Sequence, residues 1–133
     1  AADRLAARFW PGPLTLIVAR RPELPSALGS EPTVGVRLPD HDLARWLLRE
    51  AGPLAVTSAN PTGGANSLTA EDVRKTLSPG PDLVVDGGPA PGGVPSTVVD
   101  CVAEPPRLLR PGPIGVEDLR RLIPNLVTGD REQ

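Results

Sequence analysis

The sequence predicts a mixed α/β domain in which one twisted sheet carries flanking helices. Short runs rich in Val, Leu and Ile alternate along the chain with segments of helical spacing, which favours this class over an all-helical or all-β fold. The 133 residues suit a single domain, and 39% of them are hydrophobic. The 18 Pro and 14 Gly indicate many rigid turns. We therefore assign residues 1–128 to one domain and expect 129–133 to fray.

The first third of the chain predicts a helix end and two strands. Residues 1–8 resemble the end of a helix, which the Pro11-Gly12-Pro13 turn stops. The run "LTLIVA" (14–19) is almost continuously apolar, as in a strand buried on both faces. A loop follows, and "TVGVRLP" (33–39) then alternates apolar and other residues as a second strand does.

The middle of the chain predicts a helix and a strand that leads into an open loop. Asp40 is placed to cap a helix over 41–51, on which three apolar residues share one face: Leu43, Trp46 and Leu47. Gly52 and Pro53 end that helix. The run "LAVTSA" (54–59) predicts a third strand, and the polar loop "NPTGG" follows it directly.

The last third predicts two helices and three short strands. Thr69 and Asp72 flank a helix start in the manner of a capping box with Asp in place of Glu. Glu117 to Ile123 is expected to form a final short helix. The three strands lie between Pro/Gly turns, in "DLVVDGG" (82–88), "STVVDCV" (96–102) and "RLLRPG" (107–112).

Composition excludes several function classes. The net charge of −2 gives no basic footprint for nucleic acid. With one Cys101 and one His41, neither an internal disulfide nor a cysteine-based metal site is available. Cys101 is interpreted as a small buried hydrophobe, and His41 as a surface residue. No apolar run approaches the length of a membrane span, so we expect a cytoplasmic protein.

Polar residues recur where the predicted strands end, beside Gly or Pro. They are Thr33, Arg37, Ser58, Asn60, Ser96, Thr97 and Arg110. Hydroxyls and amides of this kind can bind an amino acid or a nucleotide, and two arginines can neutralise a carboxylate and phosphates. The alternative interpretation is that the small polar residues form turns and the arginines are solvated charges. The spacing predicts a small-molecule site and names no ligand.

Three familiar catalytic patterns do not fit. The Gly-rich "GGPAPGG" lacks the Lys-Ser/Thr of a P-loop. "TSAN" and the arginines form no Ser-His-Asp triad. The acidic residues are scattered over separate elements, so they predict no metal cluster: Asp40, Asp42, Asp86 and Asp100.

Five segments in order resemble the YrdC/Sua5 family: "FWPGPLTLIV", "VGVRLPDH", "PLAVTSANPTGG", "GGVPSTVVD" and "LLRPGPI". They extend from Phe9 to Ile114. The resemblance implies a YrdC-like twisted α/β sheet around a concave, positively lined cavity. It also implies a synthase that makes threonylcarbamoyl-AMP and pyrophosphate from L-threonine, bicarbonate and ATP, with Mg2+ bound to the nucleotide. The product would pass to the transferase machinery that forms the t6A base of tRNA.

The same resemblance implies roles for seven residues. Arg37, Ser58 and Ser96 would bind L-threonine. Four others would bind ATP: Thr33, Asn60, Ser67 and Arg110. Gly63 and Gly64 would let the nucleotide approach the backbone. We assign no catalytic base and no protein ligand for a metal.

One departure from the family pattern leads to further alternatives. Members begin with a strand of the PT-(D/E)-T-x-Y-G-L kind and a Lys-x-Arg motif, which this sequence lacks. We therefore expect the N-terminal part of the domain to be missing, in a fragment or in a truncated homologue. A double-stranded RNA-binding module and a carbamoyl-adenylate module of a carbamoyltransferase are the other functions considered.

Overall fold

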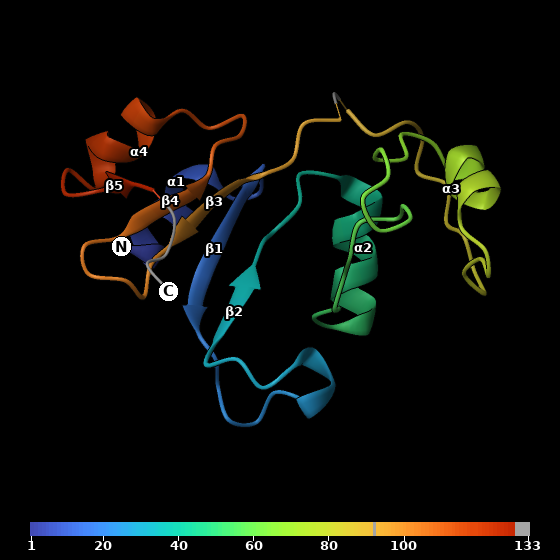
Figure 1. Ribbon diagram of the computed structural model, residues 1–133, viewed down its shortest axis with the longest axis horizontal. Helices are drawn as coiled ribbons and strands as arrows, with labels where there is room; N and C mark the ends of the chain where they lie inside the picture. Colours follow the sequence, from blue (N-terminus) through green and yellow to red (C-terminus); the bar gives the residue numbers. More distant parts are fainter. Residues whose placement is uncertain (92, 130–133) are drawn as a thin grey trace. The chain divides into compact units, whose positions relative to one another are not determined.

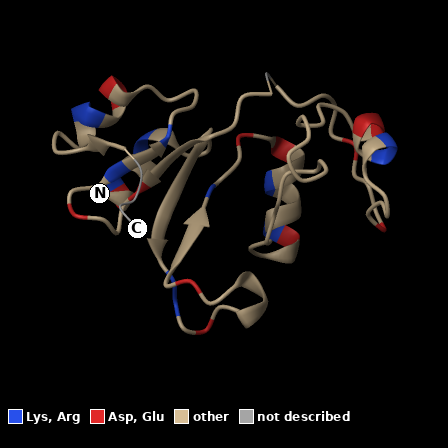
Figure 2. Ribbon diagram, viewed as in Figure 1, with Lys and Arg blue, Asp and Glu red and all other residues tan. Residues whose placement is uncertain are grey.

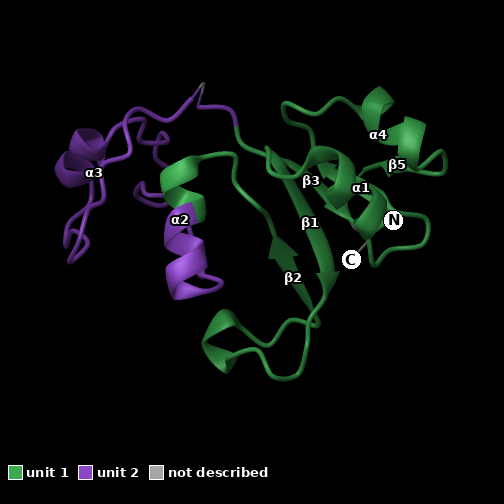
Figure 3. Ribbon diagram, turned by 180° about the vertical axis from the view of Figure 1, so that it is seen from behind, with its two compact units in different colours: residues 1–45, 95–133 green, residues 46–94 purple. Residues whose placement is uncertain are grey.

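The computed structural model describes residues 1–91 and 93–129. The chain forms two compact units (Figure 3). Unit 1 contains Ala1–Arg45 and the chain from Pro95 onward, and unit 2 contains Trp46–Val94. The whole sheet belongs to unit 1 (Figures 1 and 3). In the described residues, unit 1 is thus built on one sheet whose strands come from both ends of the sequence.

The sheet is mixed, as the sequence predicts, with the strand order β2-β1-β3-β4-β5. β1 (Leu14–Ala19) is antiparallel to β2 (Thr33–Val36) and parallel to β3 (Thr97–Asp100). β4 (Arg107–Arg110) is antiparallel to β3 and parallel to the short β5 (Val127–Thr128), which the sequence analysis did not predict. β1 and β3 therefore form the centre of the sheet.

The hydrophobic core covers one face of this sheet. α1 (Ala2–Phe9) and α4 (Val116–Leu122) supply its helical side, and α1 lies against β1 and α4 (Figure 1). The buried apolar residues are Leu5, Leu14, Leu16, Val99, Leu108, Leu119, Ile123 and Leu126. β1 alternates buried and half-buried residues, so the prediction that it is buried on both faces is wrong. Its second face carries Thr15 and Ile17, which are only half-buried.

Two predicted strands, at 54–59 and 82–88, are wrong: in the described part of the chain neither segment forms a strand. Val56 and Leu83, which the prediction placed in strands, are 84% and 78% exposed. β-branched composition shows only that a segment suits a pleated surface, whereas a strand also needs a neighbour to bond its N–H and C=O groups. Among the described residues neither segment is paired with another strand, and the sequence pattern alone does not show whether a strand finds a partner.

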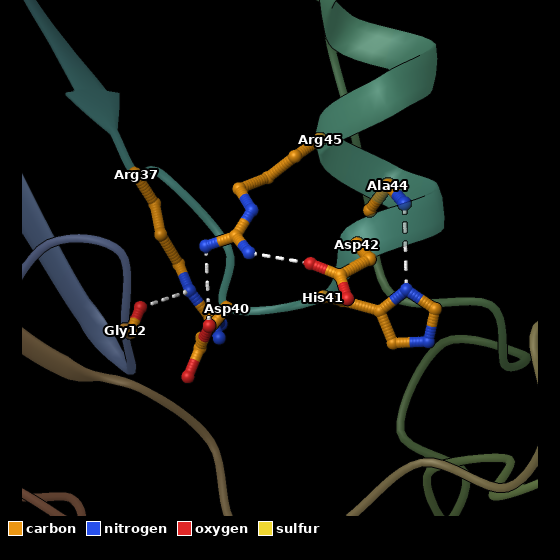
Figure 4. Close-up of polar contacts among 7 residues, drawn as sticks. All are labelled: Gly12, Arg37, Asp40, His41, Asp42, Ala44 and Arg45. Atoms are coloured by element: carbon orange, nitrogen blue, oxygen red, sulfur yellow. Dashed lines mark hydrogen bonds and ion pairs between the residues drawn. The ribbon is translucent and has the colours of Figure 1, made fainter.

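The predicted helix starts are half right. α3 (Ala70–Thr76) begins with the predicted capping box, in which the Thr69 hydroxyl accepts from the Asp72 N–H and the Asp72 carboxylate accepts from the Thr69 N–H. At α2 (Asp42–Ala51) the cap predicted at Asp40 is wrong, because the Ala44 N–H donates to Nδ1 of His41 at 3.3 Å (Figure 4).

Acidic residues beside this helix start pair with one arginine. Asp40 and Asp42 accept from Arg45 at 3.2 and 2.6 Å (Figure 4). His41 is exposed, as predicted. Of the three residues predicted to share an apolar face of α2, Leu43 is half-buried, whereas Trp46 and Leu47 are 53% and 38% exposed. Of the predicted frayed tail, residues 130–133 lie outside the described residues.

Gly112 fixes the turn after β4 against the start of β3. A Cβ atom added there would lie 2.4 Å from the Thr97 nitrogen and 2.8 Å from the Pro95 oxygen, both of them backbone atoms that cannot move aside alone. The glycine of the "RPG" motif is therefore required for close approach of two backbone segments.

We predict that Gly112→Ala lowers the free energy of unfolding by about 1–3 kcal/mol, because overpacking displaces the backbone. Urea denaturation followed by tryptophan fluorescence measures the change. Gly80→Ala is the matched control, since its Cβ would have as nearest neighbour the Leu77 oxygen at an ordinary 3.6 Å. Equal effects of the two substitutions would show that the close approach is unimportant.

Candidate functional site

Arg37 is held at the end of β2 by the turn that precedes β1. Its Nε donates to the Gly12 carbonyl oxygen at 3.0 Å (Figure 4), and the Gly12 N–H donates to the Leu38 oxygen at 2.9 Å. A Cβ on Gly12 would lie 2.3 Å from the Phe9 oxygen, so a larger residue does not fit. The "PGP" turn, predicted only to stop a helix, therefore also positions Arg37.

A β-bulge sets the position of Arg110 on β4. Leu108 pairs with Val99, whereas Val98 pairs with Arg110, which leaves Leu109 as an extra residue. In regular alternation Arg110 would lie opposite Thr97, which is fully buried on the core face. The bulge instead pairs it with Val98, on the opposite face from Val99 and Leu108. Arg110 is thus directed away from the core.

Ser96 lies where the two central strands begin and is bonded from two sides. Arg110 donates from Nε to the Ser96 carbonyl oxygen at 3.0 Å and from Nη2 to its hydroxyl at 3.1 Å. The same hydroxyl lies 2.7 Å from Oγ1 of Thr15. Ser96 is only 6% exposed. The structure thus joins Ser96 and Arg110, two of the predicted site residues.

Thr15 is a site residue that the sequence analysis missed. It lies on β1, inside the apolar run "LTLIVA", where it was counted as part of a buried strand. A polar residue at the second position of such a run is the signal that could have revealed it. Because strand residues alternate between faces, Thr15 lies opposite to Leu14 and Leu16.

The two arginines of this face, Arg37 and Arg110, act on each other electrostatically. Partial burial lowers the pKa of Arg37, and the positive charge of Arg110 lowers it further. Two strands separate β2 from β4, a distance of about 14 Å at the usual strand spacing. Thr15, on β1, and Ser96, which precedes β3, lie between the strands that carry the two arginines. Two like charges near the same part of the sheet favour an anion there.

Thr33, a predicted nucleotide contact, is not brought to this cluster. It pairs with Ala19 at the other end of the β1–β2 hairpin. Thr33 precedes Arg37 by four positions, which is about 13 Å along the strand.

The remaining predicted contacts belong to unit 2, in the loop at 58–67. Asn60 donates from Nδ2 to the Pro61 and Gly64 oxygens, both at 3.0 Å, and Ser67 donates to the Ala59 oxygen at 2.8 Å. Both side chains therefore close the loop, which is the alternative role that turn chemistry suggests for them. Ser58 is exposed. The side-chain oxygen Oδ1 of Asn60 is buried without a hydrogen-bond partner among the described residues.

The glycines of this loop have conformational reasons of their own. Gly63 has a φ of 77°, a conformation that favours glycine. A Cβ on Gly64 would lie 3.1 Å from the Pro61 oxygen, so the turn itself disfavours a larger residue. That these glycines admit a nucleotide stays a prediction.

A cavity of about 700 Å³ lies elsewhere in unit 1, at the end of β3 away from Ser96. It is lined by residues of α1, of the turn after β3 and of the segment after α4, among them Arg4, Cys101, Glu104 and Asn125. None of the predicted site residues lines it. The positively lined cavity that the resemblance implies stays a prediction.

Cys101, at the edge of this cavity, is a protonated thiol at neutral pH. Burial raises its pKa to about 11, and the neighbouring Asp100 contributes in the same direction. This agrees with its interpretation as a small hydrophobe.

We predict that Cys101 of the folded chain reacts slowly with a thiol-specific disulfide reagent at pH 8. The rate should rise with pH as the thiolate forms, and the urea-unfolded chain should react fast at pH 8, because a free thiol ionises near pH 8.5. Absorbance of the released thiolate measures both rates. Equal rates in the folded and unfolded chain at pH 8 would contradict the raised pKa.

No helix in the described ranges is both long and apolar enough to cross a membrane.

The relatives found by comparison with known proteins have similar names. A Bacillus subtilis protein named threonylcarbamoyl-AMP synthase is 44% identical to 92% of this chain. A Mycobacterium tuberculosis protein is 41% identical, also over 92% of this chain. The chain spans 57% of the length of the M. tuberculosis relative and 36% of the B. subtilis one.

Solved structures support the same relationship. The crystal structure of Pyrococcus abyssi Sua5 complexed with L-threonine matches with a TM-score of 0.88 and 37% identity, over 96% of this chain and 38% of that one. The family of the Sua5, YciO and YrdC proteins, described as "Telomere recombination", matches residues 1–112. The chain therefore belongs to the Sua5/YciO/YrdC family.

Proposed function

We propose that this chain forms part of an L-threonylcarbamoyladenylate synthase, which converts L-threonine, bicarbonate and ATP to threonylcarbamoyl-AMP and pyrophosphate. The observation that carries the proposal is the cluster of Arg37, Ser96 and Arg110, which joins two guanidinium groups and a hydroxyl on one face of the sheet. Its support from outside the chain is the name of the B. subtilis relative and the match to Sua5 complexed with L-threonine.

In this proposal each member of the cluster has a distinct role. Arg37 holds the threonine carboxylate, for which a planar guanidinium is a bidentate donor. Ser96 donates its hydroxyl to the same substrate. Arg110 neutralises a phosphate of ATP. Of the other predicted contacts, Ser58 stays a prediction for L-threonine, and Asn60 and Ser67 stay predictions for ATP. Thr33 stays a predicted ATP contact, although its distance from Arg37 separates it from the cluster.

The reaction needs little covalent chemistry from the protein. The threonine amine forms a carbamate, with release of a proton when it takes up CO2 or of water when it takes up bicarbonate. The carbamate oxygen then attacks the α-phosphorus of ATP, and the bond to pyrophosphate breaks. The chain's own contribution is to hold two anionic reactants together and to neutralise their charge. No described residue is required as a general base.

Mg2+ enters the proposal only as the ion that accompanies ATP. Among residues 1–91 and 93–129, no three His, Cys, Asp or Glu side chains gather where they could hold a metal. In the proposal the ligands of Mg2+ are therefore the phosphate oxygens of ATP, and no protein side chain is assigned to the ion. We also propose a cytoplasmic setting, with the product passed to the t6A transferase machinery.

The net charge of −2 gives double-stranded RNA binding little support. Figure 2 shows acidic positions on the same helices as basic ones. Among the described residues, at least four cations form ion pairs with nearby acids, for example Lys75 with Glu71 and Arg121 with Asp118; two others are Arg45 and Arg120. Paired charges release fewer phosphate counterions than a free basic surface would.

We predict that Arg37→Ala weakens L-threonine binding by about 10- to 100-fold, the usual loss for a hydrogen-bonded charge. Isothermal titration of the chain with L-threonine, and then with ATP and Mg2+, measures it. Arg21→Ala is the matched control, since this exposed arginine lies in the loop after β1, beyond the opposite end of the hairpin.

Two results would contradict the proposal. One is equal L-threonine affinity of the Arg37→Ala variant and the unaltered chain. The other is a folded chain that binds neither L-threonine nor ATP, which would show that these residues do not form the site by themselves.

A further inference from the structure

Thr15 is held in one orientation by the strands on either side of it. Its γ-methyl and Cδ1 of Ile17 each lie 3.4 Å from the point that a Cβ on Gly35 would occupy, so the two groups together line the space that this glycine leaves on β2. Its hydroxyl lies 2.7 Å from that of Ser96, on the side of β3. A β-branched side chain is stiff at χ1, so a fixed methyl also fixes the hydroxyl.

The Ser96 hydroxyl has limited hydrogen-bonding capacity, which makes the direction of its bond to Thr15 decisive. A hydroxyl has one proton to donate and two lone pairs that accept. One lone pair already accepts from Nη2 of Arg110. If Ser96 donated to Thr15, its proton would be used, and only a lone pair would face a ligand. If Thr15 donates, both lone pairs are used and the Ser96 proton stays free.

An anion selects the second arrangement. Arg37 and Arg110 create a positive potential over this part of the sheet, and a carboxylate or phosphate oxygen there needs donors, not lone pairs. A chain of bonds from Thr15 and Arg110 to Ser96 also polarises the Ser96 O–H and strengthens its donation.

We propose that Thr15 is a positioning residue, which donates to Ser96 and thereby directs the Ser96 hydroxyl proton to the carboxylate of L-threonine. The inference rests on the proposed function for the identity of the ligand. The hydrogen-bond geometry itself applies to any small anion at the two arginines.

Titration of the full chain with L-threonine tests the inference in three variants. Thr15→Val keeps the shape and loses the hydroxyl, and should weaken binding by about 3- to 10-fold, the usual value of one hydrogen bond. Thr15→Ser keeps the hydroxyl and should restore most of the affinity. In a Ser96→Ala background, Thr15→Val should have no further effect, because the group that it orients is gone.

A ligand without a carboxylate separates orientation from general structural damage. L-threonine amide has no carboxylate, so Thr15→Val should weaken its binding much less than that of L-threonine. Equal losses for the two ligands, or an additional loss in the Ser96→Ala background, would overturn the proposal. Circular dichroism and urea denaturation confirm that each variant is folded.

Inorganic phosphate distinguishes failure of this inference from failure of the proposed function. If the unaltered chain binds phosphate but not L-threonine, the proposed function is wrong for this chain. Thr15→Val should then still weaken phosphate binding by a similar factor, and an unchanged phosphate affinity would overturn the role of Thr15. A folded chain that binds neither anion contradicts both proposals.

Discussion

The parallel pairing of β1 with β3 is the contact on which the rest of the structure depends. It joins Leu14–Ile17 to Thr97–Asp100, segments more than 80 residues apart in the sequence. On one face of this pair lie the buried Leu14, Leu16 and Val99, and on the other lies the hydrogen bond between Thr15 and Ser96. β2 and β4 are added on either side, so the core and the polar face share one scaffold.

Close backbone approach explains why glycine stands at the turns that support this scaffold. Gly12 lies against the Phe9 carbonyl and Gly112 against the start of β3, in both cases without space for a Cβ atom. These two turns also hold the arginines, because Arg37 bonds to Gly12 and Arg110 precedes Gly112 by two residues. The Pro-Gly motifs are therefore not simple chain reversals. They set where two guanidinium groups lie.

The sequence predicted the elements whose residue pattern or hydrogen bonds are local. The strand at 14–19 and the Thr69–Asp72 capping box were predictable because apolar runs and cap chemistry are local properties. The strands predicted at 54–59 and 82–88 failed because pairing is not local. For the same reason Arg37, Ser96 and Arg110 could be proposed as site residues from their motifs, whereas the bulge at Leu109 and the bond from Thr15 depend on register between distant strands.

Binding of an anion at Arg37 and Arg110, as proposed, would also stabilise the sheet. β2 and β4 are not neighbours, and β1 and β3 alone connect them. An anion bridging Arg37 and Arg110 is a non-covalent cross-link over both central strands. By mass action, such a ligand stabilises the folded chain in proportion to the logarithm of its concentration. If an anion binds there as proposed, the phosphate or sulfate concentration of the buffer would change the stability of the fold in the same way as a substrate would.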